Sequence, residues 1–343
     1  MKFYLAPLEG ITGYIYRNAL HDYYGMGINK YFMPFLAPHT KRSFNAREKN
    51  DLLPEHNAGM YAVPQILTNS AEDFLRIEKD LLAFGYQELN INLGCPSGTV
   101  VAKGRGAGFL LEPGKLDQFL EEVFSKTNAK ISLKTRIGMD EPEEFYRLLE
   151  IYNKYPLEEL IIHPRVREEL YRGKPHYEIF RYAMEHSKNP LCYNGDIVSI
   201  QSYVNLLADW KEESDQDRKK VTSIMLGRGV LKDPALIEKL AVFAADGACE
   251  TETEETDTEE TDGKTDRKKL LAFHDRLLSD YEAELSGDKN VLFKMKELWA
   301  YLIFQFPGKE KEAKAIRKAQ RLSEYRAAVR SVFAEDGDCR ERF

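Results

Sequence analysis

The sequence predicts an α/β fold: a (β/α)8 TIM barrel followed by a small C-terminal helical bundle. Two observations carry this prediction, the regular spacing of strand-like runs and the purely helical pattern behind them. Most runs start about 27 to 32 residues apart, and eight strand-plus-helix units in roughly 250 residues are what such a barrel needs. The runs begin near Phe3, Tyr31, Tyr61, Glu88, Ile131, Glu159, Pro190 and Thr222.

Helix-like stretches separate these runs. They cover residues 70–84, 113–127, 142–155 and 177–187, and a further one over 234–242 is expected to end the barrel, which gives a first domain of residues 1–242. Behind it, residues 267–284, 290–306 and 310–333 predict three helices, with Asp288 and Pro307-Gly308 at the breaks. Residues 267–343 are therefore predicted to form a helical domain.

The segment 243–266 between the two domains is predicted to be an acidic, disordered linker or insertion. Between Asp246 and Asp266 there are ten acidic residues against one lysine, in a Thr/Glu repeat with little apolar content. This tract carries −9 of the total charge of −7, so the rest of the chain sums to +2. The tract could repel non-specific RNA or serve as a neutral linker.

The C-terminal segment from Lys309 to Arg330 is basic. It holds eight Lys or Arg against three Glu, with apolar residues at helical spacing. Two interpretations remain open on charge alone, a solvated helix face and a helix that lies against phosphates.

Composition excludes several classes of protein. No apolar run reaches the roughly 18 residues of a membrane span, and the N-terminus lacks the pattern of a signal peptide. A cytoplasmic monomer without membrane contact is therefore expected. The four cysteines lie far apart with no Cys-x-x-Cys pair, which favours neither a disulfide framework nor a metal site.

Chemically active side chains follow the predicted strands. Because active sites of this barrel class form at the carboxyl ends of the strands, these residues should meet at one mouth. Glycine-containing turns after strands seven and eight favour a phosphate site, where Arg228 would add a charged contact. The strand-end residues are Ala6, Pro7, Leu8, Gln65, Asn92, Cys95, Lys134, Arg136, His163, Arg165, Asn194, Gly195, Asp196, Gly227, Arg228 and Gly229.

Structural explanations compete for several of these residues. Lys134 lies in an apolar strand, where a lysine is costly unless it meets an anion, which favours a ligand. His163 and Gln65 could equally be hydrogen-bonded core residues. Cys95, held between Gly94 and Pro96, could be a nucleophile, a metal ligand or a buried structural thiol.

Several motifs, taken in order, resemble those of the tRNA-dihydrouridine synthases. This family has an FMN-binding barrel and a small helical domain, and it reduces selected uridines of tRNA with NADPH. The most specific motif is Asn92-Leu93-Gly94-Cys95-Pro96 with the loop that follows it. That loop includes Val100–Gly104 and Gly106–Gly108. The supporting motifs are Ala6-Pro7-Leu8, Lys134–Gly138, His163–Arg165 with Tyr171 and Gly173, Asn194–Ile197 and Gly227–Gly229.

The resemblance implies a role for each matching residue. Hydride would pass from N5 of reduced FMN to C6 of uracil, and the Cys95 thiol, protonated at its ordinary pKa of about 8.5, would give a proton to C5. The implied FMN contacts are Ala6, Pro7, Leu8, Gln65, Lys134, His163, Asn194, Gly195, Asp196, Gly227 and Arg228. The implied contacts to the uridine and its neighbouring phosphates are Asn92, Lys103, Arg136, Arg165 and Tyr171. Those to the rest of the tRNA are Lys309, Lys311, Lys314, Arg317, Lys318 and Arg321.

Two features depart from the family pattern: Leu8-Glu9 replaces a methionine and a small residue, and Pro164 follows His163. Two alternatives stay open. An FMN barrel acting on a small molecule, such as a dihydroorotate dehydrogenase or an ene reductase, would share the phosphate loops. A non-catalytic RNA-binding relative would share the basic surface. The sequence predicts neither the target uridine nor a preference between NADPH and NADH.

Overall fold

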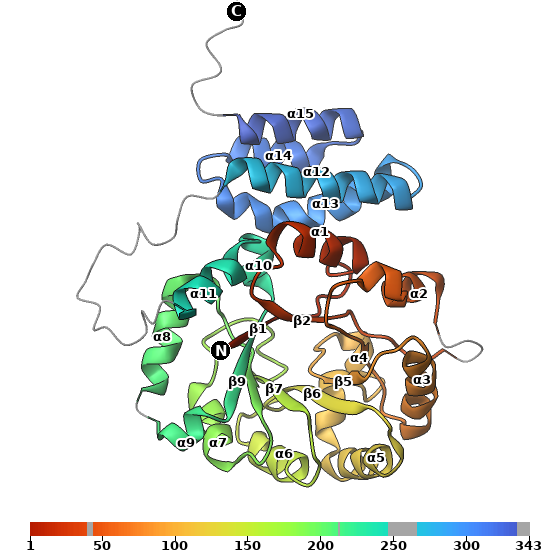
Figure 1. Ribbon diagram of the computed structural model, residues 1–343, viewed down its shortest axis with the longest axis vertical. Coiled ribbons are helices and arrows are strands. Elements are labelled where there is room, and N and C mark those ends of the chain that lie inside the picture. Colours follow the sequence, from red (N-terminus) through yellow and green to blue (C-terminus); the bar gives the residue numbers. More distant parts are fainter. Residues whose placement is uncertain (40–43, 212, 246–265, 335–343) are drawn as a thin grey trace, which may run out of the picture.

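The computed structural model describes residues 1–39, 44–211, 213–245 and 266–334. Figure 1 shows a barrel ringed by helices, with a stack of further helices on one side of it. The acidic tract lies outside the described residues, apart from Asp266. Among the described residues no helix combines the length and apolar character needed to cross a bilayer.

The barrel is a single sheet of parallel strands in the order β3-β2-β1-β9-β8-β7-β6-β5-β4. β3 and β4 are separated only by Pro64, and they pair with β2 and β5 respectively, so together they close the barrel. Proline cannot donate to the ladder, which explains the interruption. The predicted barrel fold is confirmed. The strands are β1 (Lys2–Leu5), β2 (Ile28–Phe32), β3 (Ala62–Val63), β4 (Gln65–Ile66), β5 (Glu88–Leu93), β6 (Lys130–Arg136), β7 (Glu159–His163), β8 (Leu191–Tyr193) and β9 (Val221–Leu226).

Helices cover the outside of this sheet. Several begin at a capping side chain: the Ser70 hydroxyl accepts from Asp73 N ahead of α3, and Asn45 and Glu48 form a capping box at α2. The helices of this part are α1 (Tyr14–Tyr24), α2 (Ala46–Leu52), α3 (Ala71–Ala83), α4 (Gly98–Val101), α5 (Pro113–Lys126), α6 (Glu144–Tyr152), α7 (Tyr177–His186), α8 (Ile200–Trp210), α9 (Asp215–Arg218), α10 (Arg228–Lys232) and α11 (Leu236–Ala245), with 3₁₀ turns η1 (Pro54–Asn57) and η2 (Gly106–Leu111).

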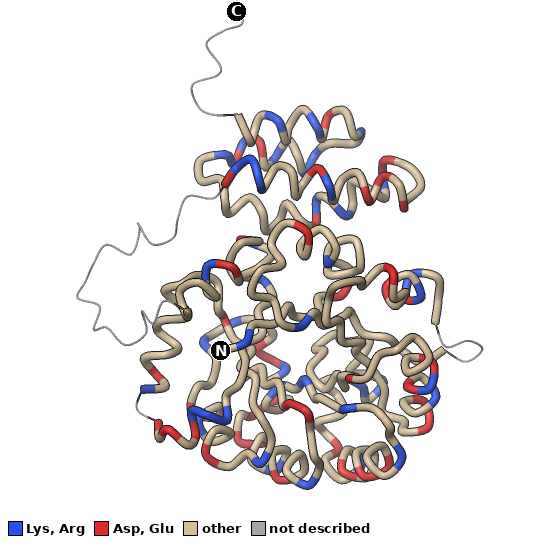
Figure 2. The backbone as a smooth tube through the Cα atoms, viewed as in Figure 1, with Lys and Arg blue, Asp and Glu red and all other residues tan. Residues whose placement is uncertain are grey.

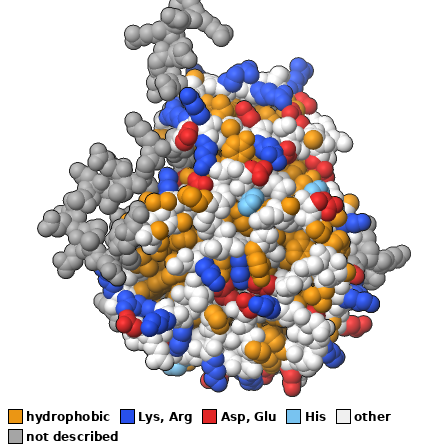
Figure 3. Space-filling model, in the orientation of Figure 1, with side chains coloured by type: hydrophobic (Ala, Val, Ile, Leu, Met, Phe, Trp, Pro, Cys, Tyr) orange, Lys and Arg blue, Asp and Glu red, His pale blue; other side chains and the backbone are white. Residues whose placement is uncertain are grey.

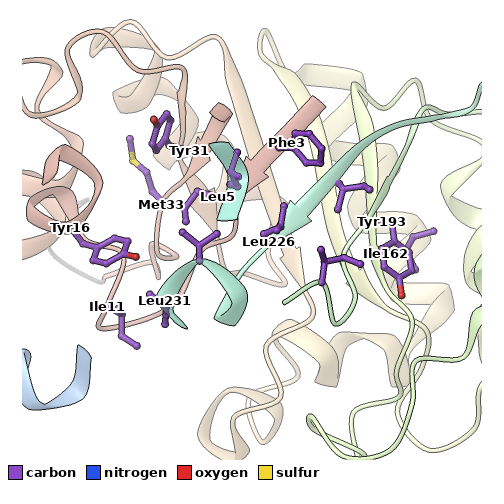
Figure 4. Close-up of a cluster of buried hydrophobic side chains, with 14 of the residues drawn as sticks. Phe3, Leu5, Ile11, Tyr16, Tyr31, Met33, Ile162, Tyr193, Leu226 and Leu231 are labelled. Atoms are coloured by element: carbon purple, nitrogen blue, oxygen red, sulfur yellow. The ribbon is translucent and has the colours of Figure 1, made fainter. Parts of the chain in front are cut away.

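Alternation along the strands produces two apolar cores. Phe3 and Leu5 of β1 face the helices and belong to the large outer core, part of which is drawn in Figure 4. Tyr4, between them, faces the barrel interior. The inner core is a small cluster of Tyr4, Ala6, Phe32, Val63, Ile161, Cys192 and Met225. Polar side chains lie at both ends of the interior.

The C-terminal region contains α12 (Arg267–Glu284), α13 (Asp288–Leu302), η3 (Ile303–Gln305), α14 (Glu310–Lys318) and α15 (Leu322–Phe333). The prediction of one helix over 310–333 was wrong, because the chain turns at Ala319, whose ψ of 132° is not helical. Two side chains hold this turn: Lys296 Nζ donates to Ala319 O, and the Glu324 carboxylate accepts from Gln320 N. Neither glycine nor proline marks this turn, so it has no local sequence signal.

The helical region packs where the first and last barrel strands meet. α12 lies along α1, with Phe273 edge-to-face against Tyr16 and Tyr24, and α13 lies against α10. The Gln305 side chain also donates to Lys232 O of α10. Because β1 pairs with β9, these contacts cover the seam between the two ends of the barrel.

Candidate functional site

The carboxyl ends of the strands surround two adjoining cavities, of about 150 and about 70 Å³. Pro7, Leu8, Lys134, His163 and Tyr171 line both, so the two form one site, called the mouth below. The first cavity is also lined by Glu9, Pro34, Phe35, Gln65, Asn92, Gly94, Cys95, Pro96 and Arg136. The second is also lined by Ala6, Asn194, Gly195, Asp196, Gly227 and Arg228.

The Cys95 loop is fixed by the strand that precedes it. Asn92 Oδ1 accepts from Gly94 N at 3.0 Å and from Cys95 N at 2.9 Å, which turns the chain sharply after β5. Ala107 N donates to Cys95 O and fastens the far side of the loop. Burial raises the pKa of the Cys95 thiol, and Glu9 adds to this, whereas a Ser97 backbone hydrogen bond opposes it. The thiol is therefore protonated near neutral pH.

A chain of amides runs across the interior to this loop. Asn92 Nδ2 donates to Gln65 Oε1 at 2.7 Å, and Gln65 Nε2 donates to Asn90 Oδ1 at 2.8 Å. Asn90 in turn donates to Ser132 Oγ. These hydrogen bonds fix the orientation of each side-chain amide, because turning over any one of the three amides would break at least two of the bonds. Asn92 and Gln65 thus reach the mouth in defined positions.

Lys134 is on β6, where it pairs with Asn92 of β5 on one side and with Ile161 of β7 on the other, and its side chain lines the mouth. Burial lowers its pKa to about 8, and the nearby positive charge of Arg136 adds to this. Within the described chain, its Nζ has no hydrogen-bond or ion-pair partner. A half-buried ammonium group without a partner in the described structure leaves its charge available to an anionic group in the mouth.

His163 is held neutral beside Lys134. Burial places its pKa well below the ordinary value, and the neighbouring cations, Arg136 first, lower it further. Arg165 Nη1 lies 3.3 Å from His163 Nε2. Because a guanidinium can only donate, Nε2 accepts and the imidazole proton is on Nδ1. His163 therefore presents one N–H donor.

The loops after β8 and β9 are tied together by Asp196. Its carboxylate forms ion pairs with Arg165 and with Arg228, the latter at 2.8 Å. The Arg228 guanidinium also lies 4.3 Å from the centre of the Tyr171 ring. A Cβ on Gly227 would point toward Ala6 at 3.5 Å, so glycine keeps this part of the mouth open. Asp196 orders the loop through its side chain.

The five predicted substrate residues lie in different settings. Asn92, Arg136 and Tyr171 line the mouth, and Tyr171 is 49% exposed. Arg165 is completely buried and lines neither cavity: besides Asp196 and His163 it donates to Arg172 O and Gly173 O. Lys103 is exposed in the loop beyond Cys95, where its carbonyl accepts from Asn69 Nδ2.

Arg136 is almost fully buried. It donates to the carbonyls of Gly94, Val166 and Leu170, so it joins the Cys95 loop to the loop after β7. A bond from each nitrogen uses three of its five N–H groups.

Sequence reasoning missed Asn90, Glu9 and Phe35. Asn90 could have been found, because it lies two positions before Asn92 and strand alternation places both on the inner face. Glu9 and Phe35 carried no periodic signal, since both lie in loops. No cluster of metal-ligating side chains is present in the described part of the chain.

Comparison with known proteins shows the family of this chain. The family model described as dihydrouridine synthase matches residues 4–332. The chain belongs to this family. It is 27% identical over 236 residues to tRNA-dihydrouridine synthase B of Pasteurella multocida, covering 68% of this chain and 67% of that one. It is 24% identical over 250 residues to a probable tRNA-dihydrouridine synthase of Staphylococcus aureus, covering 69% and 70%.

Membership of the dihydrouridine synthase family confirms the resemblance seen in the motifs around Cys95 and Lys134. Among solved structures, morphinone reductase aligns with a TM-score of 0.46 at 13% identity, covering 74% of this chain and 90% of that one.

Proposed function

We propose that this protein is an FMN-dependent tRNA-dihydrouridine synthase that reduces the C5=C6 bond of specific tRNA uridines with NADPH. One observation carries the proposal: a thiol that burial keeps protonated, Cys95, lines the same cavity as Lys134, a half-buried cation with no partner in the described structure. A neutral acid beside a group that attracts negative charge suits the addition of a hydride and a proton across a polarised double bond.

We infer that the mouth binds a flavin mononucleotide. Ala6, Pro7 and Leu8 would lie against the ring, while Gln65, Lys134 and His163 offer N–H donors to its polar edge. Asn194, Gly195, Asp196, Gly227 and Arg228 would hold the ribityl chain and phosphate. When bound and reduced by NADPH, the flavin supplies a hydride for C6 of uracil. Lys134 would stabilise the negative charge of the reduced ring.

Cys95 would complete the reaction. Hydride addition at C6 leaves negative charge spread over C5 and the O4 carbonyl, and the Cys95 S–H bond breaks to give its proton to C5. The product is dihydrouracil, and the thiolate takes up a proton from solvent. Asn92 would set the position of the sulfur, because its side-chain oxygen accepts hydrogen bonds from the backbone N–H groups of Gly94 and Cys95. Its second amide N–H and the free N–H groups of Arg136 are available to the base.

The tRNA must present its uridine unstacked at the mouth. We assign the other phosphate contacts to the basic residues of α14 and the start of α15. Lys311, Lys314, Arg317, Lys318 and Arg321 are exposed there, and Lys309 is half-buried. Figure 2 marks basic residues along this outer layer and Figure 3 shows basic side chains on its surface, while Figure 1 shows α12 and α13 between it and the barrel. A cytoplasmic monomer fits this function.

The test is direct. The purified protein should be yellow, release FMN on denaturation, and form dihydrouridine in tRNA from a strain that lacks the protein, with NADPH consumed in equal amount. Cys95→Ala should retain FMN and lose roughly 10² to 10⁴ in uridine reduction, the usual yield of a placed proton donor. Cys192→Ala is the matched control, because Cys192 is buried in the inner core. Unchanged turnover in Cys95→Ala would contradict the assignment.

A further inference from the structure

A larger cavity, of about 310 Å³, lies between the barrel and the helical region. Its walls are mainly apolar and come from α1, the start of α2 and the end of α12. The larger apolar residues of its lining are Ile11, Tyr14, Ile15, Pro34, Tyr281 and Leu285. We call it the interdomain cavity.

The interdomain cavity opens to solvent, and its volume reaches the range of small-ligand pockets, about 300 to 1,000 Å³. An open apolar hollow of this size between two parts of a chain is a usual form of a ligand site.

The interdomain cavity continues from the mouth. Pro34 lines both, and the segment Leu8-Glu9-Gly10 passes from one to the other. At this boundary Arg47 Nη2 pairs with Glu9 at 2.6 Å, and Lys294 Nζ donates to Gly10 O. A polynucleotide with one base in the mouth would carry its next phosphate past Arg47, which is 60% exposed.

The walls suit a planar base. Tyr14 is stacked on His56, with ring centres 4.2 Å apart and planes 9° apart, and Tyr281 lies in the same wall. Rigid aromatic rings of this kind are the surfaces on which unpaired bases stack. Asn50 donates to Glu284, so a carboxylate and an amide also reach the cavity, where they can meet the polar edge of a base.

We propose that the interdomain cavity binds the base of a tRNA nucleotide adjacent to the target uridine, with Arg47 on the phosphate between the two bases. This inference rests on the proposed function and deepens it, because it names a second unstacked base as part of substrate recognition. We assign the site to the tRNA and not to NADPH: Arg47 pairs with Glu9 and lies near the charges of Asp51 and Glu48, and one guanidinium in these acidic surroundings suits a single phosphodiester better than the several phosphate charges of a dinucleotide.

The experiment fills the cavity from its solvent side. Ala46 is exposed at the first position of α2 and lines the cavity, so Ala46→Trp places a ring where the base would lie without disturbing the Asn45 cap. Ala283→Trp is the matched control, an exposed alanine of α12 outside the lining. Arg47→Ala is the second variant and removes no buried group.

Two rates are measured: dihydrouridine formation in tRNA, and NADPH oxidation by ferricyanide without tRNA. Ala46→Trp should lower kcat/KM for tRNA about 10-fold or more, the range that loss of one stacked base gives, with NADPH oxidation unchanged. Arg47→Ala should weaken tRNA binding and reduce the salt dependence of its affinity by about one phosphate contact. Ala283→Trp should behave as the wild type.

Three results would overturn the inference: wild-type kcat/KM in Ala46→Trp, an equal loss in Ala283→Trp, or a loss of NADPH oxidation in Ala46→Trp. Failure of the proposed function is distinguishable, since the wild-type protein would then form no dihydrouridine at all.

Discussion

Two lysines inside the barrel have opposite surroundings. Lys30, on β2 near the amino end of the sheet, donates to both carboxylate oxygens of Glu88, at 2.9 and 2.8 Å. It also lies over the rings of Tyr4 and Tyr61, at 5.3 and 5.6 Å. Lys134, near the carboxyl end, has no such partner among the described residues, and its pKa is lowered to about 8.

The contrast separates a charge that serves the fold from one that, in the function we propose, serves a ligand. The protein itself supplies the compensating anion for Lys30, so this lysine needs no bound group. At the carboxyl end it leaves a cation uncompensated at a cost in stability, which only an incoming anionic group offsets. Polar side chains occur at both ends of the barrel, so pairing is the informative difference.

The largest expected effect is on stability, and it concerns Lys30 near the amino end of the barrel. Lys30→Met should destabilise the protein by about 3–5 kcal/mol, because it leaves the buried Glu88 carboxylate uncompensated. Urea unfolding followed by circular dichroism measures this. Adding Glu88→Gln in the same chain should recover most of the loss, and a single variant as stable as wild type would remove the basis of the comparison.

The next effect is a pH dependence of stability caused by Lys134, near the carboxyl end of the barrel. The folded pKa of Lys134 lies below its ordinary 10.5, so the folded protein binds fewer protons than the unfolded chain between about pH 8 and 10.5. The stability of flavin-free protein should therefore rise with pH across this window relative to Lys134→Met, by up to about 3 kcal/mol. Measuring the unfolding free energy of both proteins at several pH values tests this. An equal change with pH in the two proteins would show that the pKa of Lys134 is not lowered in the folded state.

Lys134→Met should weaken flavin binding about 10- to 100-fold, by loss of one charge-assisted contact. The flavin-free protein should be no less stable than wild type near neutral pH, since an unpaired buried charge is removed. Fluorescence titration with FMN gives the affinity. Retained affinity combined with a loss of stability would assign Lys134 to the fold, as for Lys30.

The smallest effect is expected at Glu159, also near the amino end. Its Oε1 accepts from Ser223, Thr222 and Tyr4, whereas its Oε2 has no partner in the described structure. Burial raises its pKa above 4.5, so wild-type stability is lost as pH rises through the folded pKa. Glu159→Gln should stay within about 1 kcal/mol of wild type at acidic pH and lose less stability on going to pH 8. An equal pH dependence in both would exclude ionisation of Glu159 as its cause.

Much of the fold could be predicted from the sequence, because the spacing of apolar residues and the helix-capping residues are local signals. Strand starts were predicted to within three residues, and α12 matches its predicted range of 267–284. The turn at Ala319 was not predictable, because it depends on Lys296 from another helix. The same division holds at the site. Strand ends placed Gln65, Asn92, Lys134 and His163 together, but the partners of Asp196 and Arg165 come from loops whose paths only tertiary packing determines.

The position of α12 and α13 over the seam between β1 and β9 has a consequence for biosynthesis. The chain is made from its N-terminus, so β1 must wait for β9 before the barrel can close, and the residues that cover this join leave the ribosome after all the strands. A nascent chain that stops after α11 would have a complete set of strands and an uncovered join, with Tyr16 and Tyr24 open to water. Quality control can therefore recognise an unfinished chain by the apolar surface along α1.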